Sequence, residues 1–194
     1  MQSLLGKHGD LLWRYANGID DESVQPYGTQ REIKSVSRGR TFRRDLVTEA
    51  EIKTGISVLA DEVARALRRL SLKGQVVIVQ IRRPDMTVIS RQTKLDHYTC
   101  LQLEIQEVAM ELIRQNWRIG APIRALIVGV TKLVPANEVV EQVSFFAGDQ
   151  ASREKQEKLE ALVDELREKH GEASITLGYQ ENKEIGVFRG KGRQ

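Results

Sequence analysis

The sequence predicts an α+β fold in which a β-α-β-β-α-β order builds a ferredoxin-like split sheet. Short runs rich in β-branched residues alternate with longer stretches of helical periodicity between residues 32 and 133. The chain has 194 residues, which is enough for one domain with a hydrophobic core and flanking segments. We therefore expect a four-stranded antiparallel sheet with two helices on one face, followed by an extra C-terminal helix.

The N-terminal stretch predicts a short helix over residues 4–18. Leu12 and Tyr15 recur near helical spacing, and Gly18 suits the position that ends a helix. Residues 19–31 are polar and contain proline and glycine, so we expect a linker there.

Residues 32–44 predict the first strand of the sheet, because β-branched and aromatic residues alternate with polar ones. Gly39 in its middle indicates a bulge or a close backbone approach. Residues 49–70 predict a helix with one apolar stripe. Thr48 and Glu51 have the spacing of a capping box at its start.

Two further runs predict a β-hairpin. Residues 75–83 are mostly β-branched, and residues 87–95 alternate between apolar and polar side chains. Pro84 and Asp85 lie between them and favour a turn.

A second helix over about residues 100–116 and a last strand over 123–133 complete the predicted sheet. Thr99 is the expected N-cap of that helix. Because both helices cover one face, the other face and the strand edges stay open to a ligand.

The region after the sheet predicts a loop over 134–151 and a charged helix over 152–170. This helix has only a narrow apolar stripe, so we expect it to be peripheral or to dock on a partner. Gly171 ends it, and we expect the remaining tail to be partly flexible.

Composition excludes several classes of protein. No apolar run approaches the roughly 18 residues of a membrane span, so we expect no membrane partner. The first ten residues lack the layout of a signal peptide. Cys100 is the single cysteine, so no internal disulfide can form, which fits a cytoplasmic location.

We expect no catalytic residue and no metal site in this chain. The three histidines, His8, His97 and His170, lie in separate segments. His97 and Cys100 have the spacing of half a metal site, but no second pair accompanies them, so we interpret Cys100 as a packed core residue.

The charge distribution points to a polyanion partner. Residues 31–133 contain 19 basic and 11 acidic residues, whereas the segments before and after are both acidic. Guanidinium groups and strand hydroxyls suit phosphate oxygens. The candidate DNA contacts on the predicted strands and turn are Lys34, Ser35, Arg38, Arg40, Thr41, Arg82, Arg83, Arg91, Thr93 and Lys94.

Two interpretations of these basic residues stay open at this point. They form a phosphate-binding surface, or they are ordinary solvated charges that limit edge pairing of the sheet. The hairpin runs contain no aromatic residue, so binding to the phosphate backbone fits better than base stacking.

Four segments, in the right order, resemble the end of the thumb and the little finger of Y-family translesion DNA polymerases of the DinB/UmuC branch. They read LGKHGDLLWRYANGIDD, KSVSRGRTFRRDL, RPDMTVISRQTKL and IRALIVGVTKL. The residues at matching motif positions are Lys34, Ser35, Arg38, Thr41, Arg91 and Thr93.

The resemblance implies a domain organisation and a function. Residues 1–18 would be the end of the thumb, 19–31 a linker, 32–133 the DNA-binding little finger, and 134–194 a clamp-binding tail with a peripheral helix. The family's palm and fingers would precede residue 1. The Mg²⁺ ions belong to the palm, so we expect no cofactor here and no nucleotidyl transfer by this chain.

A second motif indicates a protein partner. The QVSFF peptide resembles the segment by which such polymerases dock on the β sliding clamp. An extended peptide with two phenylalanines suits an apolar pocket on a partner. The clamp-binding candidates are Gln142, Val143, Ser144, Phe145 and Phe146.

Two functions therefore follow from the sequence. The first is sequence-independent DNA binding in damage tolerance and DNA repair, through a little finger that is not itself catalytic. The alternative is a stand-alone ferredoxin-like interaction module that docks on the sliding clamp and binds DNA weakly or not at all.

Overall fold

The computed structural model describes residues 5–21, 23–24, 26, 32–139, 147–172, 174–176 and 183–187. Two compact units divide the chain, residues 1–32 and residues 33–194.

The first unit contains helix α2 (Lys7–Ala16). Its end is the one expected: Gly18 takes a φ of 70°, and the amide of Ile19 donates to the carbonyl of Arg14 at 2.9 Å. This is a Schellman-type end, which needs a residue in the left-handed region at the position of Gly18.

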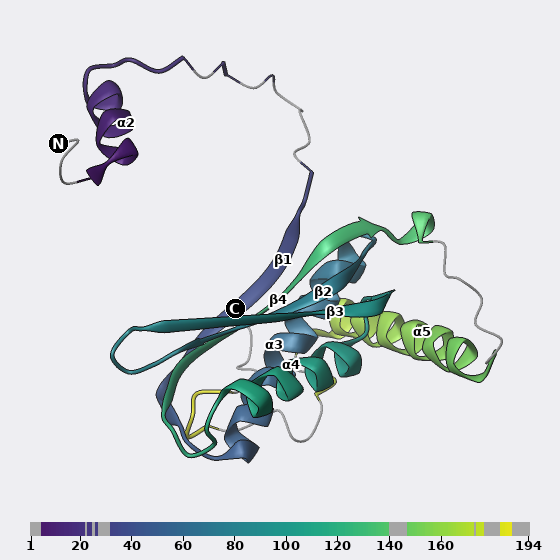
Figure 1. Ribbon diagram of the computed structural model, residues 1–194. Coiled ribbons are helices and arrows are strands. Elements are labelled where there is room, and N and C mark those ends of the chain that lie inside the picture. Colours follow the sequence, from purple (N-terminus) through teal and green to yellow (C-terminus); the bar gives the residue numbers. More distant parts are fainter. Residues whose placement is uncertain are drawn as a thin grey trace. The chain divides into compact units, whose positions relative to one another are not determined.

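The second unit is built on one four-stranded antiparallel sheet with the strand order β1-β4-β2-β3 (Figure 1). Strands β1 and β3 form the two edges, and each helical crossover joins strands that are separated by one other strand. The strands are β1 (Ser35–Leu46), β2 (Leu72–Arg82), β3 (Val88–Thr99) and β4 (Ile123–Pro135).

Helices α3 (Glu49–Arg69) and α4 (Gln102–Asn116) lie on the same side of the sheet, as Figure 1 shows. Their apolar faces meet the sheet in one hydrophobic core, to which α3 gives Ile52, Ile56 and Leu59, all fully buried. The predicted α+β fold with two helices on one face is confirmed.

The start of α3 also follows the sequence. The Thr48 hydroxyl accepts from the amide of Glu51 at 3.3 Å, and the Glu51 carboxylate accepts from the amide of Thr48 at 3.1 Å. Burial acts to raise the pKa of Glu51, but the amides of Val47 and Thr48 and the nearby Arg44 outweigh it and lower the pKa to about 2. The predicted capping box is confirmed.

The start of α4 differs from the prediction. Leu101 is the N-cap and makes no side-chain capping bond, while Thr99 accepts from the amide of Leu101 at 3.0 Å, before the helix begins. The amide of Gln102 instead donates to both carboxylate oxygens of Glu160, at 3.2 and 3.1 Å. A side chain from a distant helix therefore takes the role expected of Thr99.

Gly39 marks a close approach and not a bulge. It pairs with Ile127 in a regular register, and the irregularity of β1 lies farther along, between Thr41 and Leu46. A Cβ atom on Gly39 would lie 2.8 Å from Cγ1 of Ile127, so a larger residue would force that side chain to move.

The C-terminal helix α5 (Ala147–His170) packs on this domain through ion pairs. Arg167 pairs with Asp61 of α3 at 3.0 Å, and their side chains are only 2% and 7% exposed. Arg68 of α3 pairs with Asp164 at 2.7 Å and also with Glu160.

Part of the tail also belongs to the core. Ile185 and Val187 are buried, and the amide of Arg43 in β1 donates to the carbonyl of Ile185 at 3.2 Å. The tail was expected to be only partly flexible, and residues 183–187 are a part of it that packs on the domain. In the described ranges, no helix combines the length and the apolar character that a membrane span needs.

Candidate nucleic-acid interface

The face of the sheet opposite α3 and α4, called here the free face, is defined by the strand register. Side chains alternate between faces along a strand, and directly paired residues share a face. Four rows, each running from β1 through β4 and β2 to β3, make up the free face. They are Ser35-Thr131-Val76-Lys94, Ser37-Gly129-Ile78-Gln92, Gly39-Ile127-Gln80-Ser90 and Thr41-Ala125-Arg82-Val88.

Small and uncharged groups dominate this face. Hydroxyl and amide side chains can bond phosphate oxygens, and none of the residues in the four rows is aromatic. A Cβ atom on Gly129 would lie 3.0 Å from Cβ of Ser37. Because glycine has no side chain, nothing projects from the free face at this position next to β1. The face can approach a polymer backbone closely and has no ring on which to stack a base.

Four of the ten candidate DNA contacts lie on the free face. Ser35 and Thr41 lie near the ends of β1, and Lys94 and Arg82 lie in the corresponding rows on β3 and β2. All four are exposed. Neither Arg82 nor Lys94 forms an ion pair with a described residue.

Arg38 and Arg40 lie on the other side of the sheet. They pair with Val128 and Leu126, whose side chains are buried beneath the helices. Arg40 bonds Glu62 of α3 at 3.1 Å, so this arginine ties β1 to a helix. Arg38 is exposed at the edge strand.

Arg91 and Thr93 also have the register of the helix side, because they pair with Val79 and Val77. Both are exposed on edge strand β3. Nε of Arg91 donates to Oδ1 of Asn116, the last residue of α4, at 2.9 Å.

The two remaining candidates lie outside the strands. Lys34 comes directly before β1 and is exposed. Arg83 follows β2, and its guanidinium carbon lies 5.3 Å from the ring centre of Trp117. The structure therefore distributes the ten candidates over the free face, both sheet edges and the hairpin turn, and their role in binding stays a prediction.

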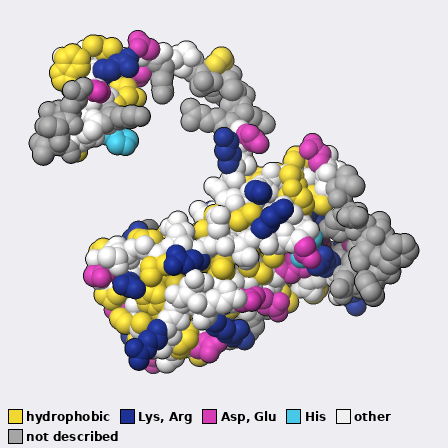
Figure 2. All heavy atoms as spheres, viewed as in Figure 1, with side chains coloured by type: hydrophobic (Ala, Val, Ile, Leu, Met, Phe, Trp, Pro, Cys, Tyr) yellow, Lys and Arg dark blue, Asp and Glu magenta, His cyan; other side chains and the backbone are white. Residues whose placement is uncertain are grey.

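Figure 2 shows how the charges lie on one side of the molecule. On the sheet unit, Lys and Arg side chains appear singly or in small groups among uncharged, hydrophobic and acidic ones. On this side of the molecule they do not form one continuous basic block.

The candidates from the sequence did not include Thr131, Gln80 and Ser90, which also lie on the free face. The signal that could have found them is the parity of each strand position, once the strand order is known. The hydrophobic pattern of each strand does not show the order in which the strands lie in the sheet.

The His97 region holds an ion-pair cluster. The ring of His97 contacts Asp96 on Nδ1 and Glu104 on Nε2, the latter at 2.9 Å, and Arg153 of α5 approaches Nδ1 at 3.2 Å. The hydrogen bond with Glu104 raises the pKa of His97, and partial burial opposes the rise. Both ring nitrogens therefore have protein partners.

Cys100 is buried, and this burial raises the pKa of its thiol to about 11. The interpretation of Cys100 as a packed residue is confirmed. Within the described residues, no group of three or more His, Cys, Asp or Glu side chains could hold a metal ion. The clamp-binding candidates Gln142 to Phe146 lie outside the described residues.

Comparison with known proteins gives a consistent family. Residues 33–145 match the model of the impB/mucB/samB family C-terminal domain. The chain is 36% identical over 174 residues to a DNA polymerase IV of Acetivibrio thermocellus, covering 90% of this chain and 43% of the relative. It is 35% identical over 183 residues to a DNA polymerase IV of Oceanobacillus iheyensis, covering 94% and 42%.

Solved structures with some similarity include a complex of a β-clamp processivity factor with the little finger domain of polymerase IV. That match has 19% identity and a TM-score of 0.45, over 57% of this chain and 97% of the other. A Y-family DNA polymerase chimera matches with 18% identity and a TM-score of 0.47, over 69% and 37%. The chain spans less than half the length of the curated relatives named above.

Proposed function

The chain belongs to the impB/mucB/samB family of Y-family DNA polymerases through the family's C-terminal domain, and on that premise we propose that it binds DNA without regard to sequence. Its role in a polymerase would be to hold the DNA during synthesis past lesions. The observation that carries this proposal is the free face, which lies opposite α3 and α4 and offers exposed neutral donors together with the exposed Arg82 and Lys94.

The chemistry of the free face favours contacts to phosphates. Ser35, Ser37 and Thr41 form a row of exposed hydroxyls along β1. Such groups position a protein on DNA but carry no sequence information. Arg82 and Lys94 add the charge that releases counterions from the DNA.

A salt series with a fluorescent primer–template duplex tests the proposal. We expect log K to fall against log salt with a slope of about −3 to −5, as roughly three to five phosphate contacts would give. No binding at low salt would overturn the proposal and would favour the interaction module that docks on the clamp.

Matched variants separate the free face from the helix side. Arg82→Ala and Lys94→Ala should each weaken binding and make the slope shallower by about 0.9. Arg40→Ala is the control, because Arg40 is engaged with Glu62 at 3.1 Å. If Arg40→Ala makes the slope of log K against log salt shallower and Arg82→Ala leaves it unchanged, the DNA lies on the side of the sheet that carries the helices.

We also propose that this chain is not catalytic and needs no cofactor. A little finger grips DNA, whereas nucleotidyl transfer needs a pair of metal ions held by carboxylates. Duplex binding should therefore persist in EDTA. Primer extension by the purified chain, with Mg²⁺ and nucleotides present, would contradict the proposal.

The second proposed partner is the sliding clamp, through Gln142 to Phe146. The support is the sequence of this peptide, in which two adjacent phenylalanines can fill an apolar pocket. Replacing Phe145 and Phe146 together by alanine should abolish clamp binding and leave duplex binding unchanged. The relatives named above are DNA polymerases, and from this likeness we propose a cytoplasmic location.

A further inference from the structure

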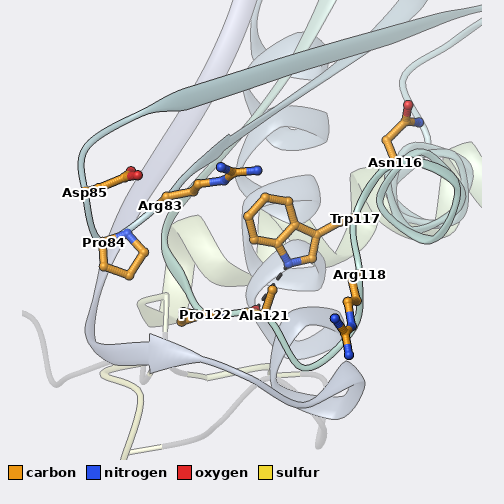
Figure 3. A pocket seen from close by; sticks show the side chains of 8 residues that line it. All are labelled: Arg83, Pro84, Asp85, Asn116, Trp117, Arg118, Ala121 and Pro122. Carbon is orange, nitrogen blue, oxygen red and sulfur yellow. Dashed lines mark hydrogen bonds between the residues drawn. The ribbon is translucent and has the colours of Figure 1, made fainter.

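A pocket of about 420 Å³ lies at the hairpin end of the sheet (Figure 3). The β2–β3 turn and the connection between α4 and β4 form its walls. We call it the turn pocket, and its lining includes Arg83, Pro84, Asn116, Trp117, Arg118 and Pro122.

The aromatic part of the turn pocket is held in one position. Trp117 is 7% exposed, and its indole N–H donates to the carbonyl of Ala121 at 3.2 Å. The guanidinium of Arg83 lies over this ring at 5.3 Å, as Figure 3 shows. Packing on the ring orients the guanidinium of Arg83, which can stack a second flat group on its outer side.

The charge at the turn pocket is mainly positive. Arg83 and Arg118 line it, and neither forms an ion pair with a described residue. Arg91 approaches from β3 through its bond to Asn116. The one acidic lining residue is Asp85, whose Oδ1 accepts from the amide and hydroxyl of Thr87.

We propose that the turn pocket binds an unpaired nucleotide of a DNA single strand. The base would stack on the outer side of Arg83 against the apolar wall of Pro84 and Pro122, and its phosphate would meet Arg118. A base inside a duplex is stacked on both sides and cannot enter, so the pocket selects single-stranded DNA. The Asp and Glu side chains of an acidic peptide would satisfy the arginines but contain no flat ring for the stacking position.

The position of the pocket supports the same occupant. Arg82 lies on the free face, and Arg83, the next residue, lies in the turn pocket. A strand with phosphates on the free face can therefore continue into the pocket. This continuity rests on the proposed function, whereas the chemistry of the pocket does not.

The test compares a blunt duplex with the same duplex carrying a 5′ template overhang, measured by fluorescence anisotropy. We expect the overhang to increase affinity about five- to tenfold, in the range of base stacking on protein side chains. Arg83→Lys keeps the positive charge but removes the planar guanidinium group, so it should remove most of the gain in affinity from the overhang. Arg82→Ala is the matched control and should weaken both DNAs while leaving their affinity ratio unchanged.

A second readout uses the fluorescence of Trp117, because Arg83 packs on its ring and transmits a change at the stacking position to it. The chain has two tryptophans, so Trp13→Phe leaves Trp117 as the only indole. Oligo-dT should quench its fluorescence, and an oligonucleotide with abasic sites of the same charge should not. The proposal is supported if oligo-dT quenches Trp117 in the Trp13→Phe chain and does not quench it after Arg83→Lys is added.

Three outcomes would overturn the proposal. These are an overhang gain that survives in Arg83→Lys, equal affinity for normal and abasic overhangs, and a Trp117 response to poly-glutamate but not to oligo-dT. The last outcome would assign the pocket to an acidic protein. If the blunt duplex does not bind at all, the proposed function fails, and the Trp117 measurement with oligo-dT still decides the pocket.

Discussion

At the scale of single residues, the buried pair of Asp61 and Arg167 is the feature with the largest expected effect. The two side chains are 7% and 2% exposed and lie 3.0 Å apart. Arg167 also donates from Nε to the carbonyl of Ile175 at 3.1 Å. Without Asp61, the buried Arg167 keeps its charge and, among the described residues, pairs only with the more distant carboxylate of Asp164, at 3.8 Å. Removing one partner of a buried ion pair costs more than the intact pair contributes to stability.

We therefore expect Asp61→Ala to lower the free energy of unfolding by about 3–5 kcal/mol, measured by urea denaturation. Combining it with Arg167→Met should restore part of that loss, because the buried positive charge that lost its closest partner is then gone. Glu165→Ala is the control, since its partner Lys169 is exposed and the unfolding midpoint should hardly move. A small effect of Asp61→Ala would contradict this account of the buried pair.

His97 should make stability depend on pH. The hydrogen bond with Glu104 raises its pKa, with a further contribution from Asp96, against partial burial and the positive charge of Arg153. Because the folded pKa lies above the unfolded one, the protonated ring contributes stability that is complete below the unfolded value of about 6.5. This contribution is lost as the pH rises through the folded pKa.

The comparison is between the wild-type chain and His97→Gln, with urea midpoints measured from pH 5.5 to 8.5. The urea midpoint of the wild-type chain should exceed that of His97→Gln at low pH, and this difference should decrease as the pH rises. A constant difference across this range would show that the ring stabilises the fold only through packing. Asp96 is exposed and should matter less than Glu104.

At the scale of elements, the capping box makes the start of α3 a local and testable feature. Thr48→Ala removes the acceptor for the amide of Glu51, and the loss of such a cap costs about 1 kcal/mol. Thr54→Ala makes the same change within the same helix, where the hydroxyl only bonds the carbonyl of Ala50. Thermal unfolding should show a lower midpoint for Thr48→Ala and none of this loss for Thr54→Ala. Equal effects of the two variants would rule out the cap as the cause.

The strands show where local pattern stops being informative. Alternation predicts that Arg38 and Arg40 share a face, and the register confirms that they do. Which face carries the helices depends on how β1 pairs with β4, and the chain between Leu46, where β1 ends, and Ile123, where β4 begins, is 76 residues long. The sequence therefore predicts that Arg40 shares a face with Arg38, but it does not predict whether that face carries the helices.

At the scale of the whole molecule, α5 and residues 183–187 pack on the sheet domain and form part of it. Glu160 bonds the first amide of α4, Arg167 neutralises Asp61, and Ile185 and Val187 fill part of the core. We expect a chain truncated after residue 139 to unfold at a much lower urea concentration than the full chain, because it loses the buried ion pair between Asp61 and Arg167 and exposes core side chains.

Truncation after residue 187 is the matched control and should keep the midpoint of the full chain. The measurement is urea denaturation followed by circular dichroism, which reports helices and strands together. Equal midpoints for the chains ending at 139 and at 187 would contradict an integral role for α5.

The sequence by itself determined the order of the elements, the capping of α3, the hairpin turn at Pro84 and the family. These depend on periodicity and on residues a few positions apart, which a single sequence displays directly. Only the tertiary structure decided how α5 docks, which arginines face the helices, and that Arg83 meets Trp117. Those contacts join residues up to 106 positions apart, and burial selects such partners only after the chain has folded.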